Sequence, residues 1–211
     1  MATRRGSGAA GGGSQVRRDV DNTRTLLLNT AVALFEKYGY DATSVQHIVD
    51  AAGRTKGAFY YYFQTKEDLL HSIHDKFIDF QLDRARAVLA RDAPLDELLA
   101  QMVTEVLMEP LGIYKSEISI FLQEQRFLSE KSFGEIRQKR DEFENAVVDL
   151  VQRGIDAGVF KDVGPARITA FGIIGMCAWS YTWLEVGGEG RLTPRQIGEQ
   201  FGRMVVDGLR A

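Results

Sequence analysis

The sequence predicts an all-α protein of about nine helices, in which a small N-terminal head precedes a larger helical domain. Two observations lead to this fold class. Apolar residues recur at spacings of three and four along most of the chain, which is the period of an amphipathic helix. Clusters of Gly, Pro and Ser separate these segments, and no segment shows the alternating pattern of a strand.

The predicted head covers residues 22–68 and follows a Gly- and Ala-rich arm. The composition of the arm predicts a flexible segment over residues 1–21. Its basic side chains either reach into the minor groove of DNA or belong to a tail without a partner. These side chains are Arg4, Arg5, Arg17 and Arg18.

The first two predicted helices of the head have clear start and stop signals. The apolar stripe of residues 22–38 stops at Gly39, which predicts the end of the first helix there. Thr43 and Gln46 have the spacing of a capping box. We therefore expect Thr43 to cap a second helix, which ends at Gly53.

A short turn joins the second predicted helix to the third. Thr55 lies just beyond Gly53 and is expected to cap a helix over residues 55–63. Two short helices joined by a tight Gly turn predict a helix-turn-helix unit, whose second helix enters the major groove of DNA.

Three consecutive tyrosines lie in this third helix. One helix face cannot bury three successive rings, because neighbouring residues point in different directions around the helix axis. We expect Tyr62 to pack inward with Phe59 and Phe63. Tyr60 and Tyr61 then face solvent or a partner.

Six more helices are predicted downstream, and they make residues 69–211 a second domain. Thr65 and Asp68 form a start signal for the first of them, and Pro94 opens the next. The expected ranges are 65–91, 94–109, 113–128, 133–157, 165–185 and 194–210.

The net charge is −3, but it is unevenly distributed along the chain. Residues 1–70 contain 9 Lys and Arg against 7 Asp and Glu, whereas residues 71–211 contain 17 against 22. A mildly basic head on an acidic body favours a local phosphate-binding surface over a generally basic nucleic-acid binder.

Other features of the sequence indicate a cytoplasmic protein without a membrane span. The single cysteine, Cys177, lies in an apolar run and predicts a buried thiol rather than a disulfide. The N-terminus lacks the apolar centre of a secretory signal. The longest uncharged run, 17 residues between Arg167 and Glu185, is shorter than the roughly 20 apolar residues that cross a bilayer.

A set of positions between residues 35 and 70 forms a specific pattern. They are Phe35, Glu36, Gly39, Tyr40, Thr43, Ser44, Ile48, Ala51, Ala52, Gly53, Lys56, Gly57, Phe59, Tyr60, Tyr62, Phe63, Lys66, Glu67, Leu69 and Leu70. This pattern closely resembles the DNA-binding head of the TetR family of transcriptional regulators. The rest of the chain is similar to the family in its length and helical pattern.

The resemblance implies a homodimer that binds a pseudo-palindromic DNA operator and is released when a small molecule enters the second domain. It also implies that the last two helices form the dimer interface. Glycines in these helices indicate close packing, with a ligand cavity as the alternative for Gly172 and Gly175. These glycines are Gly172, Gly175, Gly198 and Gly202. The expected DNA-binding residues are Thr43, Arg54, Thr55, Lys56, Gly57, Tyr60, Tyr61 and Lys66.

Arg54 departs from the family pattern, which more often has a small or apolar residue between the glycine and the helix cap. A guanidinium group either reads guanine with two hydrogen bonds or holds a phosphate. Because the turn usually lies over the DNA backbone, we favour the phosphate contact.

Two stretches of the second domain, FLQEQRFL at residues 121–128 and the segment of residues 172–209, loosely resemble TetR-type regulators of fatty-acid and sterol catabolism. Several of those regulators respond to acyl-CoA thioesters. The aromatic and Met side chains here predict a hydrophobic effector site, with a packed core as the alternative for each residue. The expected site residues are Phe80, Met102, Phe121, Gln125, Arg126, Phe143, Met176, Trp179 and Trp183.

Arg126 is the residue expected to meet a carboxylate or phosphate of the effector, unless it faces solvent. An acyl-CoA is one such effector. Another apolar compound, such as a drug or an aromatic molecule, is the alternative.

A metalloenzyme is the alternative class of function. It would need a carboxylate-bridged metal site built across several helices. His71 and His74 are three residues apart, as in some metal sites, but no His-Glu-x-x-His motif or Cys/His cluster accompanies them, so we favour ordinary surface histidines. We expect no catalytic residue, no metal and no cofactor. The carboxylates considered were Glu117, Glu124, Glu142 and Glu144.

Overall fold

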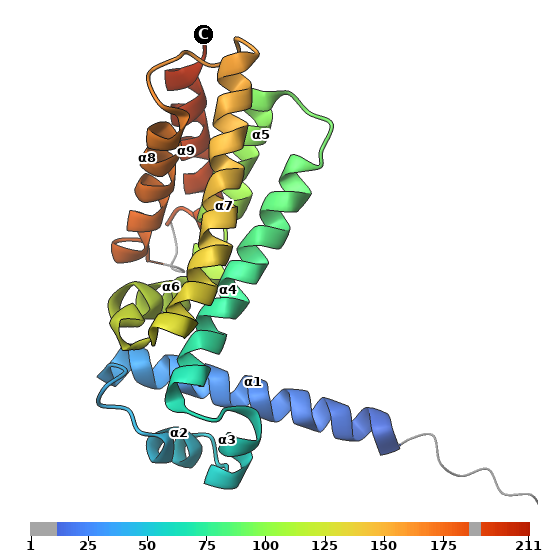
Figure 1. Ribbon diagram of the computed structural model, residues 1–211, viewed down its shortest axis with the longest axis vertical. Coiled ribbons are helices and arrows are strands. Elements are labelled where there is room, and N and C mark those ends of the chain that lie inside the picture. Colours follow the sequence, from blue (N-terminus) through green and yellow to red (C-terminus); the bar gives the residue numbers. More distant parts are fainter. Residues whose placement is uncertain (1–11, 186–190) are drawn as a thin grey trace, which may run out of the picture. The chain divides into compact units, whose positions relative to one another are not determined.

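The computed structural model describes residues 12–185 and 191–211, with side chains from residue 22 onward (Figure 1). Within these ranges the chain forms nine α-helices, and its extended pairing is limited to one isolated bridge between Phe160 and Arg210. The all-α fold class predicted from the sequence is confirmed. Contacts divide the chain into two compact units, Met1–Leu69 and Leu70–Ala211.

The first unit consists of α1 (Gly12–Tyr38), α2 (Val45–Ala51), α3 (Lys56–Tyr62) and the start of α4. α1 packs against both α2 and α3. The core of this unit contains the side chains that the spacing of three and four residues predicted to face inward. They include Leu27, Ala31, Phe35, Ile48, Val49, Phe59 and Phe63.

α1 begins earlier than the sequence suggested. The expected flexible arm extended to residue 21, whereas the helix already starts at Gly12. The prediction is therefore wrong for residues 12–21, which include Arg17 and Arg18. No proline interrupts this stretch, and glycine lowers helix propensity without blocking a helix. Arg4 and Arg5 lie outside the described residues.

The second unit is a bundle of longer helices. α4 (Lys66–Leu89) begins in the first unit and continues into the second. α7 packs along α8, while α9 packs against α5 and the segment that follows it. The elements after α4 are α5 (Leu95–Gln101), α6 (Leu111–Glu124), α7 (Glu130–Asp156), α8 (Ala166–Ala178) and α9 (Pro194–Leu209).

The segment Met102–Met108 continues α5 as a π-helix, where the sequence predicted a regular helix. The amide of Glu109 donates to the carbonyl of Thr104, five residues earlier, at 2.9 Å. Such stretches are rare and are often associated with functional sites. Six of its seven residues are buried. The π-helix is therefore packed against α9, and the local sequence does not predict it.

Gly198 and Gly202 of α9 face the interior of the chain itself. A Cβ atom at Gly198 would lie 2.9 Å from the Thr104 Cα, and one at Gly202 would lie 3.1 Å from the Ala100 carbonyl oxygen. The expectation that these glycines serve a dimer contact is therefore wrong, because α5 and the π-helix already fill that space.

Two further helices differ from their predicted ranges. The helix expected over residues 165–185 ends at Ala178 and is followed by the 3-10 turn Trp179–Thr182. α6 contains a kink at Tyr114, where φ is −114° and ψ is 19°. Helix ends and kinks depend on packing that the apolar period does not encode.

Candidate nucleic-acid interface and ligand cavity

The turn between α2 and α3 is a Schellman motif closed by Gly53. The Gly53 amide donates to the Asp50 carbonyl at 3.1 Å, and the Arg54 amide donates to the Val49 carbonyl at 2.8 Å. Gly53 has a φ of 60°, which glycine adopts without steric cost. The helix-turn-helix unit predicted from the sequence is thus formed by a specific local mechanism.

α3 presents two of its three tyrosines to solvent. Phe59 and Phe63 are buried, whereas Tyr60 and Tyr61 are 53% and 73% exposed. Tyr62 is half-buried, and its ring meets the edge of Tyr61 at 4.9 Å between centroids. The prediction of two outward rings is therefore confirmed, whereas Tyr62 does not join Phe59 and Phe63 in the core.

The caps of the two helices differ in how well the sequence predicted them. The Thr55 hydroxyl accepts from the Ala58 amide at 3.1 Å, so the predicted cap of α3 is confirmed. α2 is capped by Ser44, whose hydroxyl accepts from the His47 amide at 3.1 Å. Because Ser44 takes this role, the predicted capping box of Thr43 and Gln46 is wrong.

Thr43 is buried, and its hydroxyl donates to the Gly39 carbonyl at 2.8 Å. The side chain therefore stabilises the loop between α1 and α2 instead of facing outward. Thr and Ser stand side by side in this sequence, and both are good caps. Only the inward rotation of Thr43 decides between them.

Lys66 also makes its contacts within the chain. Its ammonium group donates to the carbonyls of Tyr40 and Thr43, at 2.8 Å each, and lies 4.1 Å from the Tyr40 ring centroid. The sequence suggested an outward cation for phosphate. In the structure the charge instead holds the loop between α1 and α2 against the first turn of α4.

The remaining predicted contact residues are exposed at the start of α3. Arg54 turns back to donate to the Gly53 carbonyl at 3.1 Å. Lys56 and Gly57 are both exposed. A Cβ at Gly57 would meet only the Thr55 hydroxyl, at 3.7 Å, so no neighbour within the chain requires a glycine there. The exposed face of α3 therefore combines a cation, a bare backbone and two phenols.

The second unit contains a partly open cavity of about 100 Å³, lined by residues of α4, α6, α7, α8 and the π-helix. Its wall is mainly apolar. Of the residues predicted for an effector site, Phe121 and Phe143 line this cavity. The other lining residues are His74, Phe77, Ile78, Gln81, Leu107, Leu111, Ile118, Leu122, Arg140, Glu144, Ile174 and Ala178.

His74 is the most unusual group in this wall. It is 3% exposed, and its ring stacks on Phe121 with 3.4 Å between centroids. Neither ring nitrogen has a hydrogen-bond partner among the described residues. Burial lowers the pKa of His74 to about 3, helped by the charges of Arg140, His71 and Lys139. The imidazole is therefore neutral at physiological pH.

Arg140 and Glu144 stand at the edge of the same cavity, with 3.6 Å between guanidinium nitrogen and carboxylate oxygen. The Arg140 guanidinium also lies 5.4 Å from the Phe121 ring centroid. Both residues line a second hollow as well. Its other lining residues are Phe133, Ile136, Arg137 and Asp141.

Seven of the predicted effector residues do not line the apolar cavity. Trp179 and Trp183 are 65% and 49% exposed, and Arg126 is also exposed. Gln125 precedes it in a 3-10 turn. Met102 is buried in the π-helix, Met176 packs on the edge of the core, and Phe80 lines a separate hollow beside Arg84. Aromatic content alone did not distinguish cavity wall, core and surface.

The sequence reasoning missed the polar members of the wall. His74 and Gln81 are seven residues apart on α4, which places both on the face that carries Phe77 and Ile78. A polar residue on an otherwise apolar helix face was the available signal. The view of His74 as an ordinary surface histidine is wrong, because the ring is buried.

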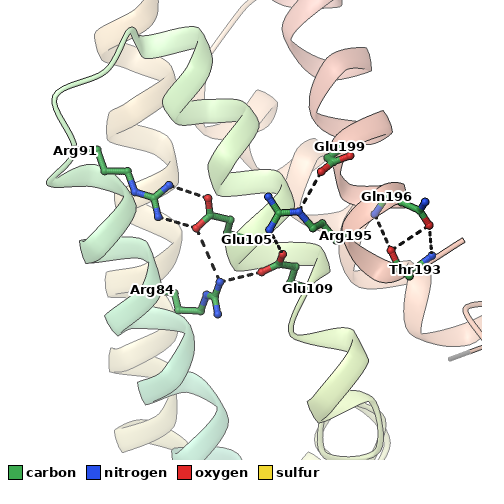
Figure 2. A network of polar contacts seen from close by, with 8 residues as sticks. All are labelled: Arg84, Arg91, Glu105, Glu109, Thr193, Arg195, Gln196 and Glu199. Atoms are coloured by element: carbon green, nitrogen blue, oxygen red, sulfur yellow. Dashed lines mark hydrogen bonds and ion pairs between the residues drawn. The ribbon is translucent and has the colours of Figure 1, made fainter. Parts of the chain in front are cut away.

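A network of ion pairs joins three elements of the second unit (Figure 2). Glu105 of the π-helix accepts two hydrogen bonds from Arg91, at 2.7 Å each. The next carboxylate, Glu109, accepts from Arg84 of α4 at 2.9 Å and from Arg195 of α9 at 2.8 Å. The hydrogen bonds from Arg91 lower the pKa of Glu105. The network therefore connects α4, the residues that follow it and α9 to the segment that contains Glu105 and Glu109.

One face of α8 and of the turn that follows it is left uncovered by the residues that the structure describes. Ile168 and Trp179 are 68% and 65% exposed. Gly172 and Gly175 lie between them, and a Cβ at either would meet no atom within 4 Å. The spacing of these four residues puts them on the same side of the helix.

The described residues contain no group of three or more His, Cys, Asp or Glu side chains that could hold a metal ion. The Nε2 atom of His71 on α4 lies 3.4 Å from the Glu135 carboxylate on α7. None of the described helices has the length and apolar character that a membrane span requires.

Two family models match the chain. The model of bacterial regulatory proteins of the tetR family matches residues 27–73. The model of the tetracyclin repressor-like C-terminal domain matches residues 92–209, which is more than half of the chain. The first range covers the helix-turn-helix head, and the second covers the helices from α5 to α9.

Individual relatives agree with this result. The HTH-type transcriptional repressor KstR2 of Mycobacterium tuberculosis is 29% identical over 199 residues, covering 92% of this chain and 96% of the relative. The structure of the ketosteroid transcriptional regulator KstR2 from the same organism has a TM-score of 0.81 and 28% identity, over 89% of this chain and 95% of that chain.

AibR, solved in complex with isovaleryl coenzyme A and operator DNA, has a TM-score of 0.75 and 25% identity, over 86% of this chain and 97% of that chain. The head, the helical body and the family matches lead to one conclusion. The chain belongs to the tetR family of bacterial regulatory proteins, and it is a DNA-binding transcriptional regulator.

Proposed function

We propose that the protein is a homodimeric repressor that leaves its operator when a hydrophobic effector occupies the cavity of the second unit. The observation that carries the DNA-binding part is the exposed face of α3. Lys56 supplies charge, Gly57 allows close backbone approach, and the phenols of Tyr60 and Tyr61 supply hydrogen bonds. These groups suit an edge of the major groove and its flanking phosphates.

The dimer is supported by the uncovered face of α8. Large exposed apolar side chains at Ile168 and Trp179 flank the bare backbone of Gly172 and Gly175. Such a face is suited to a second helix that approaches closely. A dimer would present two copies of α3 to half-sites spaced by about one or more turns of DNA. Operator binding of this kind takes place in the cytoplasm.

We infer that the effector belongs to the acyl-CoA thioesters. The cavity wall is mostly apolar, and Arg140 connects it to the hollow that also contains Arg137. This order suits an acyl group inside and an anionic head outside. The AibR complex with isovaleryl coenzyme A supports the same class. Another apolar compound, such as a drug or an aromatic molecule, is the alternative.

α4 is the element through which an occupant acts. The helix begins at Lys66 in the first unit and contributes His74, Phe77, Ile78 and Gln81 to the cavity wall. An occupant that displaces this helix changes how the DNA-binding head is held. Complete switching requires the effector to prefer the released form by roughly 10⁴-fold.

The test uses the full chain and a fluorescent DNA fragment from the region upstream of its own gene. Binding is measured by anisotropy, first without effector and then with isovaleryl-CoA, octanoyl-CoA or free coenzyme A. We expect specific binding that the thioesters release and free coenzyme A does not. Release by neither thioester would contradict the acyl-CoA assignment, and absence of specific DNA binding would contradict an operator in this fragment.

The regulator and the effector class are separate conclusions, so a second measurement distinguishes them. Tyr60→Phe and Tyr61→Phe remove only the phenolic hydroxyls from exposed rings. We expect weaker operator binding, an unchanged melting temperature and an unchanged response to thioester. If both variants bind the operator as tightly as the unaltered protein, the two hydroxyls do not contact DNA.

A further inference from the structure

The apolar cavity contains one polar side chain whose hydrogen-bonding groups are unused. The Gln81 amide donates to the Val106 carbonyl at 3.3 Å, and Arg140 lies 3.6 Å from Glu144. His74 has no such partner on either ring nitrogen among the described residues. Buried polar groups are nearly always hydrogen-bonded in proteins. The exception at His74 therefore calls for a partner from outside the chain.

The ring of His74 is held in the wall of the cavity. It stacks on Phe121 with 3.4 Å between centroids and 16° between ring planes. Both rings line the cavity. Stacking on one face leaves the nitrogens at the ring edge, which is where hydrogen bonds form. Both ring nitrogens have less than 1 Å² of accessible surface, so an occupant of the cavity reaches them when the side chains around the ring edge shift.

The charge state of His74 selects the chemistry of that group. Burial and the neighbouring cations of Arg140 and Lys139 lower the pKa of the imidazole and keep it neutral. A neutral imidazole offers one donor and one acceptor. It therefore suits an uncharged oxygen, either a hydroxyl or a carbonyl, better than a carboxylate.

The cavity volume limits the group further. About 100 Å³ is somewhat less than the 150 Å³ of an engineered apolar cavity that admits benzene. The portion that reaches His74 is therefore compact, such as a single ring or a short branched chain. A larger effector would keep its remaining atoms outside this chamber.

We propose that His74 determines effector specificity by hydrogen-bonding an uncharged hydroxyl or carbonyl oxygen on the compact apolar portion of the ligand. This inference rests on the proposed effector role of the cavity and adds the requirement for an oxygen deep inside it. A plain hydrocarbon of the same size would leave His74 unpaired and would bind less tightly.

The test compares three small probes: phenol, toluene and benzoate. Phenol and toluene have nearly the same shape and differ by hydroxyl against methyl. Binding to the full-length protein is followed by NMR titration. We expect phenol to bind more tightly than toluene by about fivefold or more, even though toluene gains more by leaving water. Equal binding, preference for toluene, or no binding of either probe would overturn the proposal.

Variants assign the preference to His74. His74→Phe keeps an aromatic ring and should lose the preference for phenol, whereas His74→Gln keeps a donor and an acceptor and should retain part of it. A preference unchanged in His74→Phe contradicts the proposal. Tight binding of benzoate in place of phenol also contradicts it, because Arg140 would then be the reading residue.

A measurement on the unaltered protein avoids dependence on folded variants. The ¹⁵N shifts of the His74 imidazole should change with phenol and stay unchanged with toluene. Absence of a phenol-specific change overturns the role of His74. The proposed regulator would still stand in that case if thioesters release DNA, so the two failures are distinguishable.

Discussion

The Glu105 carboxylate accepts two hydrogen bonds from the Arg91 guanidinium, at 2.7 Å each, and so ties the π-helix to the residues that follow α4. Two parallel bonds of this kind match the planar fork of arginine to the two carboxylate oxygens. The pair connects residues 14 positions apart in sequence. The pair therefore stabilises the π-helix through a contact with a residue outside it.

Glu105→Gln should lower the free energy of unfolding near pH 7 by about 1 kcal/mol or less, because solvent screens this partly exposed pair. The pKa of Glu105 is lowered from 4.5 in the folded state, so its contribution is complete above 4.5 and is lost as the pH falls. Urea denaturation near pH 7 and near pH 4 should show a smaller difference at the lower pH.

Asp149→Asn is the matched control, since Asp149 is exposed on α7 and away from this network. It should leave the stability nearly unchanged at both pH values. An equal loss in Glu105→Gln at both pH values would show that charge is not the origin of the effect.

Gly198→Ala and Gly208→Ala should have opposite effects, although both lie in α9. The new Cβ at Gly198 would lie 2.9 Å from the Thr104 Cα, which requires a backbone shift and should cost about 1–3 kcal/mol. The Cβ at Gly208 meets nothing within 4 Å, so the change should be neutral or stabilising by up to about 1 kcal/mol. Thermal unfolding of the two variants measures the difference, and similar melting temperatures would refute the packing argument.

His74 makes folding sensitive to mild acid. Its pKa is lowered from 6.5 to about 3 in the folded state, so the unfolded chain binds an extra proton between these values. Stability is therefore complete above 6.5 and falls with decreasing pH, by up to about 1.4 kcal/mol per pH unit.

His74→Phe should show a flatter dependence over the same interval, because phenylalanine does not titrate. Urea midpoints measured between pH 7.5 and pH 5 compare the two proteins. Parallel curves would mean that His74 does not contribute to the acid sensitivity, whatever the absolute stability of the variant.

Lys56 and Lys66 should separate into a DNA contact and a structural residue. Lys56→Ala should weaken binding to all DNA sequences and lower the slope of log K against log salt by about one, with little change in melting temperature. Lys66→Ala loses two charged hydrogen bonds to the Tyr40 and Thr43 carbonyls and should destabilise the protein by about 1–3 kcal/mol.

The two variants are measured together by thermal unfolding and by DNA titration at several salt concentrations. If Lys66→Ala lowers the slope of log K against log salt without loss of stability, Lys66 contacts DNA. An unchanged slope in Lys56→Ala would remove Lys56 from them.

Much of the head could be predicted because its signals are local. The apolar spacing of Ile48 and Val49, the glycine at position 53 and the hydroxyl of Thr55 act within a few residues of one another. The choice between Thr43 and Ser44 as a cap was not predictable from these signals. It depends on the contact of Thr43 with the end of α1.

The candidate effector site was less predictable, because a cavity is a property of several helices together. Phe121 and Phe143 were found by their aromatic character, but Trp179 and Trp183 share that character and are exposed. His74 was treated as a surface residue. Its burial follows from the packing of α6 and α7 over α4. The sequence of α4 alone does not show this packing.

The amino-acid sequence by itself determined the helices, the helix-turn-helix turn, the outward tyrosines and the family. These follow from periodicity, caps and residue types that act over one or two helical turns. The tertiary structure alone decided the π-helix, the inward role of Gly198, the loop contacts of Lys66 and the unpaired imidazole in the cavity. Each of these depends on atoms from segments distant in sequence, and their distances are set only when the helices pack.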